Sequence, residues 1–151
     1  GHSEDVLPEV CRRAPFDLAF FDQRGSRYCA DLAALEAARA LRPGAVLLAD
    51  NVLKPGAPAF LWRVVRGGDF ETRIVAMEEH AMPGVEDWMS LSVRLAAGAP
   101  APAPPPELRR LEWEADRIRA RAEQGGVTFR AWAEFVAGMR ERLLRLGLGP
   151  T

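Results

Sequence analysis

The amino-acid sequence predicts an α/β fold with a parallel sheet. Two short segments, 17–21 (DLAFF) and 45–49 (AVLLA), are almost wholly apolar, which is typical of strands covered by helices on both faces. The segment between them, 31–41, is rich in Leu, Ala, Glu and Arg, which favour helix. A strand, a helix and a strand at this spacing predict a right-handed βαβ unit with two adjacent parallel strands.

Turn and stop residues limit the other elements of the first two thirds of the chain. The helix is expected to end at 42–44 (RPG), because proline cannot continue a helix and glycine favours the position after the last turn. A proline opens a short helix expected over 58–65. Segments 70–77 and 88–95 lie on either side of the turn at 82–84 (MPG) and predict two late strands.

The C-terminal third predicts a linker followed by a pair of helices. Residues 97–106 (AGAPAPAPPP) have the composition of an extended, semi-rigid linker. Beyond it, two segments repeat apolar residues at helical spacing, and Thr128 is suited to cap the second one. The apolar positions are Leu108, Leu111, Ala115, Ile118 and Ala122 in the first helix and Phe129, Trp132, Val136, Met139 and Leu143 in the second.

Composition and charge exclude several classes of partner. A net charge of −1 over 151 residues argues against binding to nucleic acid or to a membrane surface. No apolar run approaches the length of a membrane span, and the chain does not open with a signal peptide. Cys11 and Cys29 have neither metal-binding nor redox spacing. Free thiols in a reducing, cytoplasmic compartment are therefore expected.

Oxygen-bearing side chains follow both strands of the predicted parallel pair. Asp22 comes directly after the first strand, and Asp50 and Asn51 come directly after the second. Because α/β folds build sites at the carboxyl ends of parallel strands, these side chains are expected to converge. Carboxylate and amide oxygens suit a hard cation such as Mg²⁺. The alternative for each residue is a helix cap or a hydrogen bond within a loop.

These strand ends lie in longer motifs that resemble the catechol O-methyltransferase family. The motifs are FFDQRGSRY at 20–28 and RPGAVLLADNVLKPGAPAF at 42–60, together with the opening GHSEDVLPEV. The resemblance runs from Gly1 to about Leu95. It implies the C-terminal half of a Rossmann-like class I methyltransferase sheet. It also implies transfer of a methyl group from S-adenosylmethionine to a metal-bound hydroxyl of a small catechol-type molecule.

The resemblance implies three sets of site residues. The Mg²⁺ ligands are Asp22, Asp50 and Asn51. The residues that contact S-adenosylmethionine are Ser3, Glu4, Asp22 and Gln23. The residues that contact the acceptor are Asn51 and Glu79. The alternatives are a frayed terminus for Ser3 and Glu4 and a solvated carboxylate for Glu79.

The chain departs from the family pattern where the catalytic base is expected. Gly25 stands in the place of the family's general-base lysine, and Arg24 stands in the place of a tryptophan that covers the substrate. Lys54 is the only lysine of the chain and follows Asn51 by three residues. It is expected to be a solvent-exposed loop lysine rather than the missing base, so no catalytic residue is assigned.

The implied domain organisation is incomplete. Residues 1–96 correspond to a partial methyltransferase domain, 97–106 to the linker and 107–151 to a helical hairpin. Methyltransferases of this class hold the methionine end of the cofactor at a glycine-rich turn that precedes the matching region, and no such turn precedes Gly1. The chain alone is therefore expected to be inactive. The alternative to an enzyme is an inactive fragment or pseudoenzyme that binds a protein through its hairpin.

The first strand is also expected to form a bare edge of the sheet. Its apolar residues Leu18, Phe20 and Phe21 would then be exposed beside unpaired backbone groups. Self-association or a protein partner is expected at this edge and at the helical hairpin, which could also fold back over the edge.

Overall fold

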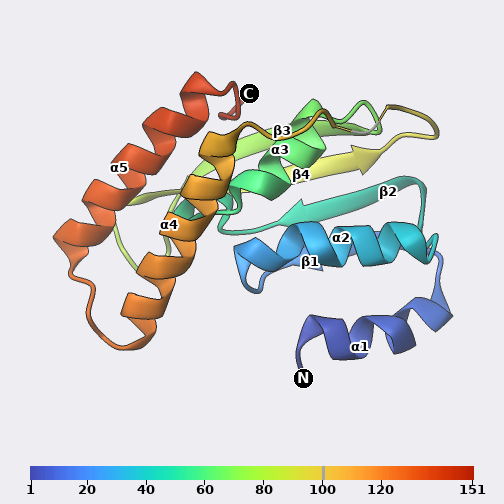
Figure 1. Ribbon diagram of the computed structural model, residues 1–151, viewed down its shortest axis with the longest axis horizontal. Coiled ribbons are helices and arrows are strands. Elements are labelled where there is room, and N and C mark those ends of the chain that lie inside the picture. Colours follow the sequence, from blue (N-terminus) through green and yellow to red (C-terminus); the bar gives the residue numbers. More distant parts are fainter. Residues whose placement is uncertain (100) are drawn as a thin grey trace.

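The structure is a computed structural model that describes residues 1–99 and 101–151. Its centre is a four-stranded mixed sheet in the order β1-β2-β4-β3. The strands are β1 (Phe16–Phe21), β2 (Leu41–Ala49), β3 (Phe70–Glu78) and β4 (Glu86–Arg94). β1 and β2 run parallel, and β4 pairs antiparallel with both β2 and β3. The predicted α/β fold is confirmed, including the late antiparallel pair (Figure 1).

Helices precede, connect and follow the strands. They are α1 (Ser3–Val10), α2 (Tyr28–Ala37), α3 (Pro58–Arg66), α4 (Pro106–Glu123) and α5 (Phe129–Arg145), with short turns η1 (Cys11–Arg13), η2 (Gly25–Arg27) and η3 (Val52–Gly56). α3, α4 and α5 agree closely with the predicted segments. Thr128 caps α5 as predicted, because its hydroxyl oxygen accepts a hydrogen bond from the N–H of Ala131 at 3.2 Å. α1 was not among the predicted elements.

The end of α2 was predicted wrongly. The helix stops at Ala37, ahead of the expected stop at 42–44. Arg39 adopts a left-handed conformation with φ of 51°. The N–H of Ala40 donates to Leu35 O at 2.8 Å, and the N–H of Arg39 donates to Glu36 O at 2.9 Å. This is a Schellman ending, in which buried Ala40 packs on the helix, so β2 already starts at residue 41.

One face of the sheet carries the hydrophobic core. α2 and α3 cover this face, α4 packs against α3 and the turn η3, and α5 packs against η3 (Figure 1). The buried stripes of the two C-terminal helices therefore join the same core as the sheet, through Leu108, Leu111, Met139 and Leu143. The linker is tied to α3, since Trp62 Nε1 donates to Pro102 O at 2.8 Å. The domain boundary at 97–106 stays a prediction.

The opposite face of the sheet is open. Leu18 and Phe20 of β1 are 56% and 55% exposed, and the strand register places them beside Val46 and Leu48 of β2. β1 forms one edge of the sheet, as expected. The expectation that Phe21 is also exposed was wrong, because alternation along the strand turns it into the core. The C-terminal helices leave Leu18 and Phe20 uncovered.

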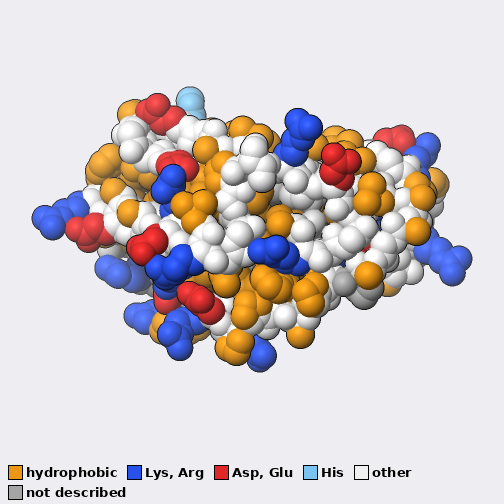
Figure 2. Space-filling view, turned by 90° about the horizontal axis from the view of Figure 1, so that it is seen from above, with side chains coloured by type: hydrophobic (Ala, Val, Ile, Leu, Met, Phe, Trp, Pro, Cys, Tyr) orange, Lys and Arg blue, Asp and Glu red, His pale blue; other side chains and the backbone are white. Residues whose placement is uncertain are grey.

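The surface mixes charge and apolar groups. Figure 2 shows basic and acidic side chains interspersed with hydrophobic ones. In the part of the chain that the structure describes, no helix has both the length and the apolar character needed to cross a bilayer.

Candidate functional site

The carboxyl ends of β1 and β2 are fastened together. The N–H of Asp50 donates to Phe21 O at 2.9 Å, so Asp22 and Asp50 leave neighbouring strands at the same edge. Tyr28 lies beneath them and donates to Asp50 O at 3.1 Å. Burial raises the pKa of Tyr28, and the negative charges of Asp22 and Asp50 raise it further. Both carboxylates therefore act on the same phenol, and the convergence of their oxygens on one cation stays a prediction.

Asn51 is held in a fixed orientation. It adopts a left-handed backbone conformation with φ of 54°. Its N–H donates to Asp50 Oδ1 at 2.8 Å, and its Nδ2 donates to Asp87 Oδ2 at 2.9 Å. Among the described residues, no hydrogen bond reaches Asn51 Oδ1 or Asp50 Oδ2. These two oxygens are the ones left to bind another group.

Asp87 is a site residue that sequence reasoning missed. It is 2% exposed and accepts hydrogen bonds from Asn51 Nδ2, from the N–H of Lys54 at 2.9 Å and from the N–H of Trp88 at 2.7 Å. Burial raises its pKa to about 6. Asp87 therefore supports the turn that carries Asn51 and Lys54. No local pattern marks it, because only the antiparallel pairing of β4 with β2 brings it there.

The predicted metal ligands have the right donor chemistry for a hard cation. In residues 1–99 and 101–151, no group of three or more His, Cys, Asp or Glu side chains is arranged to hold a metal ion. The predicted set differs in kind, because it combines the carboxylates of Asp22 and Asp50 with the amide oxygen of Asn51. Its oxygens are hard donors, and Asp22 is exposed and Asn51 Oδ1 unengaged. The donor chemistry of these three residues therefore suits a hard cation such as Mg²⁺.

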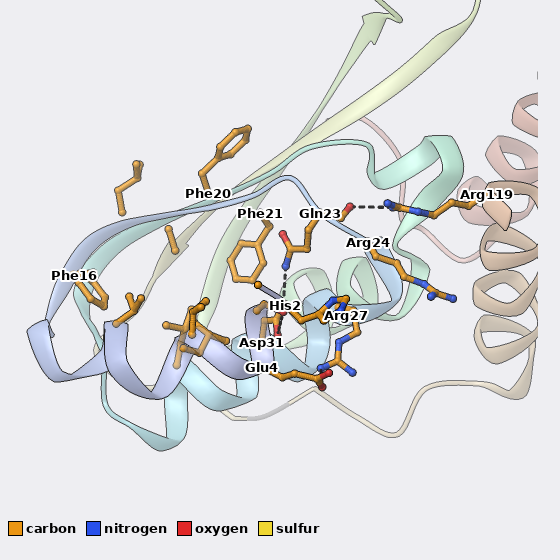
Figure 3. Close-up of a pocket in the computed structure, with 18 of the residues that line it drawn as sticks. His2, Glu4, Phe16, Phe20, Phe21, Gln23, Arg24, Arg27, Asp31 and Arg119 are labelled. Carbon is orange, nitrogen blue, oxygen red and sulfur yellow. Dashed lines mark hydrogen bonds and ion pairs between the residues drawn. The ribbon is translucent and has the colours of Figure 1, made fainter. Parts of the chain in front are cut away.

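A hollow of about 830 Å³ lies between α1 and β1 (Figure 3). Three of the predicted cofactor contacts, Ser3, Glu4 and Gln23, line it, whereas the fourth, Asp22, is not part of its wall. Ser3 Oγ donates to Asp31 Oδ1 at 2.9 Å, and Gln23 Nε2 donates to Asp31 Oδ2 at 2.6 Å. Asp31 is 3% exposed. This buried carboxylate was missed, and it joins two of the predicted contacts into one unit.

A second pocket of about 300 Å³ lies where η3 meets the C-terminal helices. Its lining includes both predicted acceptor residues, Asn51 and Glu79, together with Lys54, Pro55, Arg119, Ala122, Glu123 and Trp132. Arg119 and Glu123 line the 830 Å³ hollow as well, so these two residues of α4 separate the two spaces.

Lys54 does not lie free in solvent. Its side chain is only 12% exposed, and its Nζ forms an ion pair with Glu79 Oε2 at 2.7 Å. The expectation of an exposed loop lysine was therefore wrong. The hydrogen bond from Lys54 lowers the pKa of Glu79, which keeps this carboxylate charged.

Gly25 is packed too closely to carry a side chain. A Cβ at this position would lie 2.3 Å from Gly56 O and 3.1 Å from Ala57 Cβ. The contact joins η2 to η3. Any larger residue, a lysine included, would force these two turns apart.

Comparison with known proteins agrees with the resemblance of the motifs. The chain is 43% identical over 74 residues to catechol O-methyltransferase from Sus scrofa, a match that covers 47% of this chain and 40% of that protein. The chain is related to the catechol O-methyltransferases. Human transmembrane O-methyltransferase is 38% identical over 92 residues, covering 58% of this chain and 31% of that protein. The chain thus spans less than half the length of these relatives. No protein-family profile matches it.

Solved structures agree on the fold. The O-methyltransferase from Bacillus cereus in complex with SAH superimposes with a TM-score of 0.52 at 19% identity, covering 62% of this chain and 48% of that one. TomG from Streptomyces achromogenes, in complex with SAM, gives 0.52 at 23% identity, with coverage of 64% and 48%. At these identities the likeness concerns the fold alone. It confirms the Rossmann-like methyltransferase sheet, and the partial coverage fits the expected C-terminal half.

Proposed function

We propose that the chain supplies the acceptor-side half of an S-adenosylmethionine-dependent O-methyltransferase that acts on a small catechol-type molecule. The observation that supports the proposal is that Asp22 and Asp50 follow hydrogen-bonded neighbouring strands. The residue after each one, Gln23 and Asn51, lines the α1–β1 hollow and the pocket beside Glu79 respectively. Sequence similarity to catechol O-methyltransferases supports the same reaction class.

The α1–β1 hollow is the proposed site for the adenine end of the cofactor. Ser3, Glu4 and Gln23 line it, and Asp22 stands at the end of the strand beside it. Asp31 fixes Ser3 and Gln23, so their orientation is set before a ligand binds. When bound, S-adenosylmethionine supplies an electrophilic methyl group. The role of the chain is to hold the acceptor oxygen in line with that methyl group. Little orientational freedom of the two reactants is then lost during the transfer itself.

Asp22, Asp50 and Asn51 are the proposed ligands of Mg²⁺, which when bound would favour the ionised form of an acceptor hydroxyl. Asp87 orients Asn51 so that its amide oxygen is free for this purpose. Asn51 and Glu79 are the proposed contacts of the acceptor. In the overall reaction, the acceptor hydroxyl loses its proton, a carbon–oxygen bond forms, and the carbon–sulfur bond of the donor breaks.

The alternative role as a protein-interaction module gains no support from the hairpin. Most of its apolar stripe is buried in the core, since Leu108, Leu111, Met139 and Leu143 are fully buried, whereas Phe129 at the start of α5 is exposed. A reducing, cytoplasmic location remains part of the proposal because both cysteines are free thiols.

Binding of 4-nitrocatechol, a chromogenic acceptor analogue, tests the proposed site. The 151-residue protein should bind the probe only with MgCl₂ present, as followed by visible absorbance. Asp50→Ala and Asn51→Ala should each weaken binding about tenfold or more, equivalent to about 1.4 kcal/mol. Asp17→Ala is the matched control, because this exposed carboxylate is paired with Arg42 on the surface. Binding that needs no Mg²⁺, or that survives both site substitutions, would refute the proposal.

A further inference from the structure

We propose that Lys54 is a substrate-contacting residue whose ammonium group stabilises the acceptor oxyanion, and that Glu79 and Trp132 position it. This inference rests on the proposed function. It concerns a phenolic acceptor and assigns to α5 a part in the site. The first observation is that the chain contains one lysine and that this lysine lines the acceptor pocket together with Asn51.

The backbone of Lys54 is fixed in position relative to Asn51. Asp87 accepts hydrogen bonds from the Asn51 side chain and from the N–H of Lys54, both at 2.9 Å. One buried carboxylate thus sets the positions of a proposed metal ligand and of the lysine. The two residues share the wall of one pocket.

The ammonium group is held on two sides. Glu79 Oε2 lies 2.7 Å from Nζ, and the Trp132 ring lies beneath Nζ with its centroid 4.8 Å away. An ammonium group has three N–H donors, and among the described residues only Glu79 accepts one of them. At least one donor therefore remains for an oxygen of a molecule in the pocket. In this ion pair the lysine acts through its positive charge and not as a base.

Packing excludes a positively charged side chain at position 25. Gly25 cannot carry a side chain, because its Cβ would collide with Gly56 O. The cations that line the pocket come from other elements, Lys54 from η3 and Arg119 from α4. Other titratable groups around Lys54 are Glu79, His80 and Asp87 near its turn and Arg119 and Glu123 on α4.

The lining of the pocket suits one class of acceptor. Trp132 and Pro55 contribute apolar rings, while Lys54 and Arg119 contribute hydrogen-bond donors. A planar ring carrying an ionised oxygen satisfies both features. Because Trp132 belongs to α5, the C-terminal hairpin is expected to determine how well that ring is held.

The ionisation of bound 4-nitrocatechol tests this role without requiring methyl transfer. The phenolate is visible by absorbance, so the pH midpoint of the bound probe can be measured in MgCl₂ for the 151-residue protein and its variants. Lys54→Met should decrease the phenolate-to-phenol ratio of the bound probe about tenfold at a given pH, a shift of about one pH unit. Lys54→Arg should restore most of the ratio, and Trp132→Leu should give an intermediate value.

Arg130→Met is the matched control, because it removes a positive charge from α5 at a side chain that is 88% exposed and outside the pocket. Circular dichroism establishes that each variant is folded. If Lys54→Met is unfolded, Lys54→Arg and Trp132→Leu still decide the question. Probe that binds and ionises alike in every folded variant would overturn the role of Lys54 alone. Probe that fails to bind the wild-type protein would overturn the proposed function, and this inference with it.

Discussion

Asn51 Nδ2 donates a hydrogen bond to Asp87 Oδ2 over 2.9 Å, joining the end of β2 to the start of β4. Through this contact the buried carboxylate of Asp87 fixes the orientation of Asn51 in the proposed site. Loss of the Asp87 carboxylate would release the Asn51 side chain and also the N–H of Lys54. The stability of the turn and the pH dependence of folding are therefore linked through Asp87.

Asp87 should make folding stability fall as pH rises from about 4 to about 6. Its folded pKa of about 6 lies above the ordinary value of 3.8. The folded state then binds the extra proton in this window, so the free energy of unfolding falls by at most about 1.4 kcal/mol per pH unit. Asp87→Asn removes this contribution. Urea unfolding across the window should show the wild type losing stability relative to the variant.

Comparing the wild type with Asp87→Asn cancels the pH-dependent contributions of the other acidic residues to the free energy of unfolding. Glu79, Asp69 and Asp116 have lowered pKa values and act in the opposite direction, but both proteins contain them. Stability curves that stay parallel between the wild type and Asp87→Asn would contradict the prediction.

Gly25→Ala should destabilise the protein by about 1–3 kcal/mol, because the added Cβ collides with the backbone of η3. Gly138→Ala is the matched control. Gly138 lies within α5 and a Cβ there meets nothing within 4 Å, so alanine should stabilise by about 0.5–1 kcal/mol. Urea midpoints of both variants measure the effect. An unchanged midpoint for Gly25→Ala would mean that η2 and η3 separate freely.

The 151-residue protein should bind S-adenosylmethionine more weakly than about 10 μM, a free energy of about −7 kcal/mol. The α1–β1 hollow offers contacts for the adenine end, and the motifs provide none for the methionine end. Titration calorimetry with Mg²⁺ present measures this affinity. Tighter binding would show that another segment of the chain completes the cofactor site.

The open face of β1 should drive self-association. Leu18 and Phe20 are more than half exposed on an edge strand, where backbone groups can pair with another chain. The double substitution Leu18→Glu/Phe20→Glu should shift the protein toward the monomer in light scattering. Leu144→Glu is the control, since Leu144 is 41% exposed on α5. A wild-type protein that is monomeric at every concentration would refute the prediction.

Much of the fold could be predicted because its signals are local. Apolar runs, proline and glycine positions and the Thr128 cap act over a few residues, so β1, β3, β4 and α3 to α5 were anticipated closely, whereas β2 starts at Leu41 and not at Ala45. The same holds for Asp22, Asp50 and Asn51, because residues that follow parallel strands must emerge at one edge of the sheet. The end of α2 was missed because Arg39 takes a left-handed conformation that the burial of Ala40 stabilises.

By itself the sequence determined the α/β class, the helical hairpin, the family resemblance and the oxygen-bearing strand ends. The tertiary structure alone decided the burial of Lys54, the support from Asp87 and Asp31, and the position of Trp132 in the lining of the pocket beside Glu79. These contacts join residues far apart in the chain, such as Asn51 and Asp87, which are separated by 36 positions. No local pattern encodes them, because each arises only when strand pairing and helix packing bring the two segments together.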